Sequence, residues 1–131
     1  MIKIYVDGAA RPNPGKGGIG VVIQGESWDY SISEPLNGKV TNNVAEYVAI
    51  GRALNELVLN KLCNRDITIF SDAEMVVEQL NGERMVQKGA YLNSYFAVKN
   101  LMGLFSKLKV EWIPREENAE ANLLVSRGID K

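Results

Sequence analysis

The first residues of the chain alternate between apolar and polar side chains, a pattern typical of a β-strand. Ile2, Ile4 and Val6 are apolar, and Lys3 and Tyr5 separate them. Short apolar runs of the same kind, bounded by turn-forming or polar residues, recur further along the chain. The predicted strands span residues 2–6, 19–24, 28–33, 67–70 and 108–112. Because only a three-residue turn separates the second from the third, we expect the first three strands to form an antiparallel meander.

Elsewhere apolar residues recur every three or four positions, which is the spacing of an amphipathic helix. The predicted helices span residues 47–58, 72–80, 95–105 and 117–127. Two stretches rich in glycine, proline or asparagine, residues 8–20 and 34–40, are expected to be loops. This order of elements predicts a single α/β domain over residues 1–131, a mixed sheet with helices packed against it.

Composition limits the chemistry that is available to this domain. The chain has 131 residues and no histidine, and Cys63 is its single cysteine. An intrachain disulfide, a multi-cysteine zinc site and Ser-His or Cys-His catalysis are therefore excluded, which leaves carboxylates as acids, bases and metal ligands. No apolar run approaches the ~20 residues that span a bilayer, and the N-terminus lacks a signal-peptide pattern. We expect a cytoplasmic protein with no membrane partner, whose net charge of −1 leaves nucleic-acid binding to a local basic patch.

Three acidic residues stand where predicted elements meet. Asp7 follows the first strand, Asp72 follows the fourth, and Glu46 lies in the first turn of the helix between them. If two neighbouring strands end at the same edge of the sheet, Asp7 and Asp72 come together and Glu46 faces them. Clustered carboxylates repel one another unless cations neutralise them, so the pattern predicts a magnesium or manganese site. Two such ions can cleave a phosphodiester, one by activating water and the other by stabilising the leaving oxygen.

Each of these acids also has a purely structural explanation. Asp7 would begin a hairpin turn. Asn43 and Glu46 have nearly the spacing of a capping box, and Ser71 and Asp72 stand where the N-cap of the next helix is expected. The grouping of all three acids favours a metal site over three unrelated structural roles.

Several stretches of the chain, in this order, resemble the motifs of type 1 ribonuclease H. They are Tyr5–Ala9 with Asn13–Gly15 and Gly18–Gly20, Thr41–Glu46, Phe70–Asp72, and Trp112–Asn118 followed by Ala121. The resemblance covers nearly the whole chain and implies a ribonuclease H-like fold, in which helices pack on a five-stranded mixed sheet of three antiparallel and two parallel strands. It also implies that Asp7, Glu46 and Asp72 are catalytic carboxylates that bind two Mg²⁺ ions, with Mn²⁺ as a substitute.

The same resemblance implies that the partner is an RNA–DNA hybrid. Asn13, Asn42 and Asn43 match positions that meet the minor groove, where 2′-hydroxyls distinguish RNA from DNA. Lys39 and Thr41 resemble the residues that grip a phosphate of the DNA strand. The implied nucleic-acid-binding set is Gly8, Asn13, Lys39, Thr41, Asn42 and Asn43.

The chain departs from the family pattern in three places. The family's fourth carboxylate is an aspartate after Ala121, and Asn122 stands there. The helical basic protrusion of some members is absent from residues 82–93, and the histidine before the last helix is missing. Glu116 or Glu117 would replace that histidine, or would simply favour the N-terminal dipole of the helix. A natural loss of activity and a deliberate near-isosteric change are the two explanations of Asn122.

The resemblance implies an endonuclease that cuts the RNA strand of RNA–DNA hybrids and leaves 5′-phosphate and 3′-hydroxyl ends. Because a neutral amide can contact a metal but brings no charge, we expect Asn122 to be a weak metal ligand and the activity to be reduced. One alternative is a hybrid-binding module of the same fold without useful catalysis. Another is a structural or protein-binding domain with no preference for hybrids. We expect a monomer with no obligate protein partner.

Overall fold

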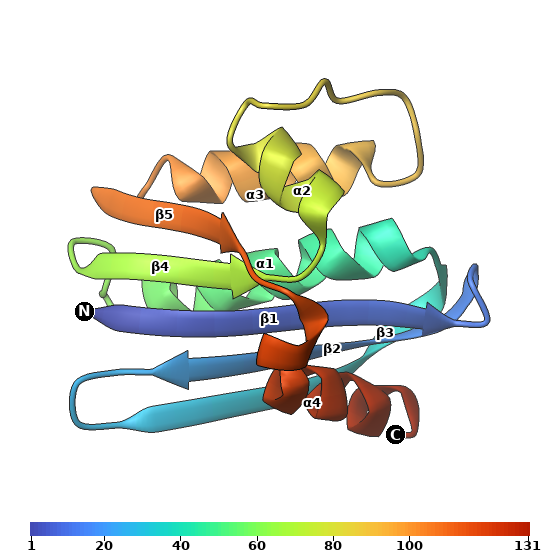
Figure 1. The fold of residues 1–131 in the computed structure, drawn as a ribbon, viewed down its shortest axis with the longest axis horizontal. Helices are drawn as coiled ribbons and strands as arrows, with labels where there is room; N and C mark the ends of the chain where they lie inside the picture. Colours follow the sequence, from blue (N-terminus) through green and yellow to red (C-terminus); the bar gives the residue numbers. More distant parts are fainter.

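A five-stranded sheet with the strand order β3-β2-β1-β4-β5 runs through the molecule (Figure 1). The computed structural model describes residues 1–131. The strands are β1 (Ile2–Arg11), β2 (Gly15–Gln24), β3 (Asp29–Val40), β4 (Asp66–Ser71) and β5 (Lys107–Trp112). The helices are α1 (Asn42–Leu59), α2 (Glu74–Leu80), α3 (Leu92–Met102) and α4 (Ala119–Ile129), and a 3-10 turn (Arg115–Glu117) precedes α4. All of the predicted strands and helices are present, with shifted ends.

The pairing of the strands confirms the expected mixed sheet. β1 pairs antiparallel with β2, and β2 pairs antiparallel with β3. β4 lies parallel to β1 on its other side, and β5 lies parallel to β4. β1 is therefore the central strand, and its parallel register with β4 places Val6 opposite Ser71. This register decides which residues meet just beyond the end of β4.

The hydrophobic core lies between the sheet and α1. The apolar residues of the N-terminal alternation, Ile4 and Val6, are fully buried, as are Ile50 and Leu54 of α1. Burial of each such side chain contributes about 1.5–3 kcal/mol. The alternating apolar side chains of β1 and the apolar side chains spaced along α1 thus pack against each other in one core.

The opposite face of the sheet is covered by α4, which lies in front of β2 and β3 in Figure 1, and the segment leading into it crosses β1. Two glycines of β2 make this close packing possible. A Cβ atom on Gly20 would lie 2.3 Å from the carbonyl oxygen of Ala121, and one on Gly18 would lie 2.7 Å from the backbone nitrogen of Ile129. Since no side chain fits in that space, the glycines let α4 lie directly on the strand.

Both predicted loops are wrong. β1 continues to Arg11 and β2 begins at Gly15, so the turn between them is limited to residues 12–14. Three glycines of this stretch, Gly8, Gly18 and Gly20, serve helix packing rather than a loop. β3 likewise continues to Val40, with an irregular register between Lys16 and Gly18 of β2. Because β3 is an edge strand, it tolerates the proline and glycine that suggested a loop.

On the side of β4 and β5, α2 and α3 are joined by a long segment without helix or strand (Figure 1). This segment, residues 81–91, is the yellow arch at the top of the view. None of the helices is both long and apolar enough to cross a membrane.

Candidate active site

Asp7, Glu46 and Asp72 come together as the sequence pattern suggested. Each offers one carboxylate oxygen, and these oxygens all lie within 4.8 Å of one another. Two neighbouring parallel strands bring the aspartates together, because Val6 of β1 is opposite Ser71 of β4 and the acids follow these residues. Glu46 comes from α1, which packs against β1. The cluster therefore forms where three separate elements meet.

Asp7 lies inside β1 rather than at its end, and it is only 4% exposed. Its neighbour Gly8 explains how α1 comes so close. A Cβ atom on Gly8 would lie 2.2 Å from the carbonyl oxygen of Ala45, the residue before Glu46. The missing side chain thus lets the first turns of α1 touch β1 and brings Glu46 next to Asp7.

The capping role suggested for Glu46 is wrong. Thr41, not Asn43, is the N-cap of α1, and its Oγ1 accepts a hydrogen bond from the backbone nitrogen of Val44 at 3.2 Å. Glu46 therefore lies too far into the helix to complete a capping box, which requires a glutamate three residues after the cap. Its carboxylate is available to the acidic cluster.

Asp72 does not cap a helix either. The N-cap of α2 is Ala73, and no side chain hydrogen-bonds to that helix end. The only local side-chain contact comes from Ser71, whose Oγ accepts a hydrogen bond from the backbone nitrogen of Ala73 at 3.1 Å. Neither Glu46 nor Asp72 therefore caps a helix. What the two residues share is their place beside Asp7 in the acidic cluster.

Burial and mutual repulsion make the cluster reluctant to ionise fully. Burial, and then the negative charge of Asp72, raise the pKa of Asp7 from its ordinary value of 3.8 to about 6. Burial also raises the pKa of Glu46 well above its usual range, and the charges of Asp7 and Asp72 add to this effect. The positive charge of Arg115 opposes the shift at Asp7. Such a site favours any ligand that brings positive charge.

Four buried side-chain oxygens in and beside this site have no hydrogen-bond partner. They are Glu46 Oε2, Asp72 Oδ2, Asn118 Oδ1 and Asn122 Oδ1. Buried polar atoms without a partner are uncommon and destabilising, so each calls for a ligand. An all-oxygen donor set of carboxylates and an amide is the kind that Mg²⁺ and Mn²⁺ prefer. The residues present therefore fit divalent cations.

Asn122 is placed by a hydrogen bond between the start of α4 and β1. The Nδ2 of Asn118 donates to the carbonyl oxygen of Val6 at 2.8 Å, and the backbone nitrogen of Asn122 donates to the carbonyl oxygen of Asn118 at 3.0 Å. Asn122 therefore lies one turn beyond a residue that is fixed next to Asp7. Its Nδ2 donates to the carbonyl oxygen of Arg115 at 3.4 Å, which leaves Oδ1 unpartnered.

Four of the residues assigned to nucleic-acid binding gather in one hollow. Asn13, Thr41, Asn42 and Asn43 line a space of about 520 Å³, together with residues 89–91. Hydrogen bonds hold two of these asparagines. Asn13 Oδ1 accepts from the backbone nitrogen of Asn42 at 3.0 Å, and Asn42 Oδ1 accepts from the backbone nitrogen of Ala10 at 2.8 Å.

Gly8 and Lys39 lie outside this hollow. Gly8 is buried beneath α1, and Lys39 is exposed on β3, opposite Lys16 of β2. For Gly8 the structure supplies a packing reason, the close approach of α1. Lys39 has no hydrogen bond or ion pair in the structure, so its charge is available to a partner.

The chain is similar in sequence and in fold to several known proteins. A family model described as reverse transcriptase-like matches residues 5–128. This chain is a member of the ribonuclease H family. The bifunctional protein Rv2228c of Mycobacterium tuberculosis is 32% identical over 98% of the chain, which spans only 35% of that protein's length. The solved N-terminal RNase H domain of Rv2228c matches with a TM-score of 0.88 over 98% of both chains.

Two further relatives match this ribonuclease H-family chain over nearly its whole length. The putative hydrolase EbsB of Enterococcus faecalis is 30% identical over 100% of the chain and 96% of its own length. LC11-RNase H1, whose crystal structure contains an RNA/DNA hybrid, is 37% identical, with a TM-score of 0.87 over 99% of this chain and 97% of its own. These matches confirm the ribonuclease H-like fold that the motifs implied.

Arg115 is a residue of this family member to which sequence reasoning gave no role. It lines a hollow of about 550 Å³ with Arg11, Glu116 and Asn122, and its charge reaches Asp7. Glu117 lies apart, beside a smaller hollow on the open sheet face, and neither glutamate belongs to the three-acid cluster. The signal that could have identified Arg115 is its place just before the acidic turn that opens the last helix.

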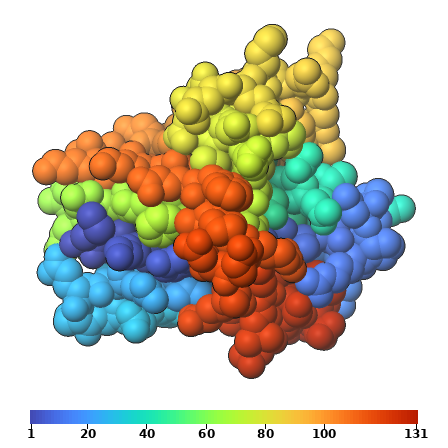
Figure 2. Space-filling view, viewed as in Figure 1, coloured from blue at the N-terminus to red at the C-terminus, as the bar shows by residue number.

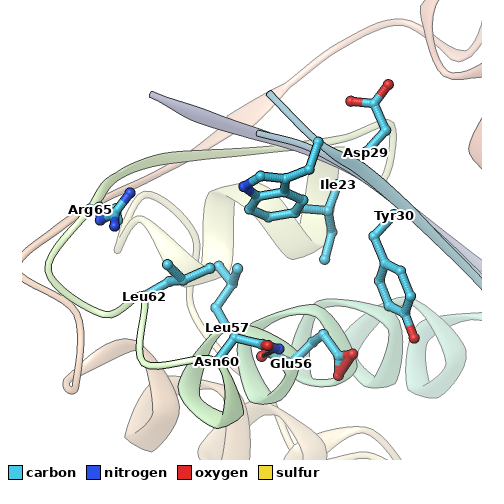
Figure 3. Close-up of a pocket in the computed structure, with 9 residues that line it drawn as sticks. Ile23, Asp29, Tyr30, Glu56, Leu57, Asn60, Leu62 and Arg65 are labelled. Atoms are coloured by element: carbon cyan, nitrogen blue, oxygen red, sulfur yellow. Dashed lines mark hydrogen bonds between the residues drawn. The ribbon is translucent and has the colours of Figure 1, made fainter. Parts of the chain in front are cut away.

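Another hollow in this family member lies away from the three-acid cluster. It measures about 590 Å³ and opens between the C-terminal end of α1 and the β2–β3 turn. Figure 3 shows Tyr30 and Arg65 on different sides of this space, with Asn60 and Leu57 of the α1 region below. Its two carboxylates, Asp29 and Glu56, form no three-acid group. The cluster of Asp7, Glu46 and Asp72 lies outside this hollow.

Proposed function

We propose that this protein is a metal-dependent endonuclease that hydrolyses the RNA strand of RNA–DNA hybrids and leaves 5′-phosphate and 3′-hydroxyl ends. One observation carries the proposal: Asp7, Glu46 and Asp72 each bring a carboxylate oxygen within 4.8 Å of the others, and Glu46 and Asp72 each have a buried oxygen without a hydrogen-bond partner. The family and the hybrid bound by LC11-RNase H1 support the choice of substrate.

Asp7, Glu46 and Asp72 would hold two divalent cations, with Asn122 as a weak additional ligand. When bound, such ions activate a water molecule and stabilise the leaving oxygen of a phosphodiester. The contribution of the chain is to hold the carboxylates in place before substrate arrives. Gly8 fixes the approach of α1, and the β1–β4 register fixes the two aspartates. Preorganisation of this kind lowers the reorganisation needed during the reaction.

The asparagines of the hollow are arranged to donate hydrogen bonds. The Oδ1 atoms of Asn13 and Asn42 are already engaged by backbone nitrogens, which orients their Nδ2 groups away from those contacts. These amide donors would reach 2′-hydroxyls or base edges in the minor groove of the hybrid, with Asn43 beside them. Lys39 and Thr41 would bind a phosphate of the DNA strand, since Lys39 carries an unpaired charge and the Thr41 hydroxyl can still donate.

Cleavage of labelled nucleic acids tests the proposal directly. Hybrid, duplex RNA and duplex DNA of one sequence are incubated with the protein in Mg²⁺, and the product ends are identified. We expect cleavage of the RNA strand of the hybrid alone, with 5′-phosphate ends, and no cleavage in EDTA. If the Asn122→Asp protein, with its full set of acids, cuts no RNA in Mg²⁺, the endonuclease assignment is wrong.

A second candidate function is favoured by Asn122, whose neutral amide leaves the α4 side of the site without an acid. The protein would then bind hybrids through its asparagine-lined hollow without useful turnover. Robust cleavage of hybrid by the unaltered chain in Mg²⁺ would exclude this function. Binding measured in Ca²⁺ separates it from a purely structural domain, which would show no preference for hybrid over duplex DNA or duplex RNA.

A further inference from the structure

The arch between α2 and α3 lies beside the nucleic-acid hollow but has no regular structure to hold it in place. Residues 81–90 form neither helix nor strand, and all but Val86 are exposed. The arch protrudes from the body of the molecule at the top of Figure 2, in yellow. Its last residues, Gly89 and Ala90, nevertheless line the same hollow as Asn13 and Asn43. Something outside the arch must therefore fix its position.

A buried glutamine makes that connection. Gln79, near the end of α2, is only 2% exposed. Its Nε2 donates hydrogen bonds to the carbonyl oxygen of Met85 at 3.3 Å and to the hydroxyl of Tyr91 at 3.1 Å. The same hydroxyl accepts a hydrogen bond from the backbone nitrogen of Gln87 at 3.1 Å. Two points of the arch backbone are thus tied to Gln79, one directly and one through Tyr91.

The connection continues to the helix that carries Glu46. Tyr47, the next residue of α1, is fully buried, and its hydroxyl donates to Gln79 Oε1 at 2.5 Å. The rings of Tyr47 and Tyr91 stack with centroids 5.7 Å apart and planes inclined by only 8°. The two stacked rings and the Gln79 amide therefore form one unit, which joins the helix that carries Glu46 to the base of the arch.

We propose that Tyr91 is a positioning residue, which, through Gln79 and Tyr47, holds the arch as the second wall of the nucleic-acid groove. One strand of the hybrid would pass between Asn13 and Asn43 on one side and Gly89 and Ala90 on the other. The small side chains of residues 89 and 90 leave room for a sugar–phosphate backbone. This inference rests on the proposed hybrid-binding function and assigns the arch to the groove that would bind the hybrid.

The physical consequence is an effect on affinity without an effect on chemistry. If the arch occupies its binding position only part of the time, the apparent Kd rises in inverse proportion to that fraction. The carboxylates are held by β1, by α1 and by the turn after β4. α1 meets the base of the arch through the stacked rings of Tyr47 and Tyr91, a contact that does not use the Tyr91 hydroxyl. Loosening the arch should therefore raise the KM and Kd for hybrid and leave kcat unchanged.

Tyr91→Phe is the variant of choice, because it removes the hydroxyl and keeps the stacked ring. Tyr95→Phe is the matched control: the Tyr95 ring packs edge-on against Tyr47 at 5.9 Å, and its hydroxyl makes no hydrogen bond in the structure. We expect the Kd for hybrid in Ca²⁺, and the KM in Mg²⁺, to rise about 10-fold in Tyr91→Phe, as for an arch in place a tenth of the time. The kcat should stay within about twofold, and Tyr95→Phe should match the unaltered protein.

Limited trypsin digestion without nucleic acid gives an independent readout, because Arg84 and Lys88 lie in the exposed arch. Cleavage after these residues should be several-fold faster in Tyr91→Phe than in Tyr95→Phe, with equal cleavage elsewhere. Equal hybrid affinity in the two variants, or a lower kcat with unchanged KM, overturns the role of Tyr91 and leaves the proposed function standing. If the unaltered protein shows no preference for hybrid, both proposals fall.

Discussion

β1, β4 and α1 supply three carboxylates to the candidate active site, whereas α4 supplies a neutral amide. On the carboxylate side, Asp7 and Glu46 have raised pKa values because they are buried close to other acids. On the α4 side, Asn122 shares its hollow with Arg11 and Arg115 and has no acid other than the exposed Glu116 nearby. The carboxylate half of the site attracts cations, whereas the α4 half already carries the positive side chains of Arg11 and Arg115.

The two halves also depend on glycine packing in the same way. Gly8 lets α1 approach the sheet from one face, and Gly20 lets α4 approach from the other. Both helices are thus set at backbone contact distance, and the position of each functional side chain follows from a missing Cβ. The difference between the halves is one of charge and not of support. The unusual amide at position 122 therefore stands on an intact scaffold.

The largest expected effect comes from removing charge on the carboxylate side. Asp7→Asn removes the charge of one carboxylate that would hold the cations, so we expect the cleavage rate in Mg²⁺ to fall by about 10³-fold. Asp29→Asn, a change of the same kind at the far hollow, is the matched control and should keep full activity. Initial rates on labelled hybrid provide the measurement. Comparable rates for the two variants would contradict the assignment of the acidic cluster.

The next effect comes from adding charge on the α4 side. Asn122→Asp should raise the cleavage rate in Mg²⁺ by at least ~100-fold, because one well-placed electrostatic group is worth ~10²–10³ in rate. Hybrid affinity in Ca²⁺ should change far less, since the asparagine-lined hollow is untouched. Mn²⁺ binds most mixed ligand sets more tightly than Mg²⁺. In Mn²⁺ the cleavage rates of Asn122→Asp and the unaltered protein should therefore differ less than in Mg²⁺.

Asn100→Asp, on the exposed surface of α3, controls for the added charge alone. It should leave the rate in Mg²⁺ unchanged. If Asn122→Asp and the unaltered protein cleave equally well at limiting Mg²⁺, then Asn122 is not a ligand in the metal site.

Much of this arrangement was predictable from the sequence, for identifiable reasons. The alternation of Ile2, Ile4 and Val6 marks a strand because every second side chain of β1 enters the core. The grouping of Asp7, Glu46 and Asp72 could be inferred because strand ends and helix starts tend to meet at one edge of a sheet. The ribonuclease H motifs added the division of the sheet into three antiparallel and two parallel strands, which local patterns alone do not determine.

The errors came from residues whose neighbours are distant in sequence. Gly18 and Gly20 signal a loop locally, but they lie within β2 because α4, a hundred residues later, needs their empty space. Thr41 rather than Asn43 caps α1, a choice between adjacent candidates that sequence preference does not resolve. The bonds from Gln79 to Met85 and Tyr91 were likewise invisible, because no local pattern signals a buried amide that holds an irregular segment.

The packing of α4 on β2 can be disrupted without changing a functional side chain. A Cβ on Gly20 would meet the carbonyl oxygen of Ala121 at 2.3 Å, and backbone cannot move aside as a flexible side chain can. Gly20→Ala should therefore lower the free energy of unfolding by about 3 kcal/mol, at the upper end of overpacking effects. Gly51→Ala on α1 is the control, because its Cβ would lie 3.5 Å from Val98 Cγ2 in ordinary contact.

Urea denaturation measures both glycine variants. Gly51→Ala should be neutral or slightly stabilising, since alanine favours a helix over glycine by up to about 1 kcal/mol. Equal stability of the two variants would mean that α4 does not rest on β2 at backbone distance.

The smallest effect concerns the dependence of stability on pH in the absence of metal. Because the pKa of Asp7 rises to about 6 on folding, the folded protein binds more protons than the unfolded chain between pH ~4 and ~6. Stability should therefore fall as pH rises through this window, and the loss of stability should be complete above it.

Asp7→Asn removes the ionisable group. At pH 7.5 in EDTA it should be more stable than the unaltered protein by at most about 3 kcal/mol, and at pH 4 nearly equal to it. Adding Mg²⁺ at pH 7.5 should stabilise the unaltered protein and close this gap, because a cation relieves the repulsion that Asp7→Asn removes. A stability difference between the two proteins that is the same at both pH values would show that repulsion among the three acids is not its source.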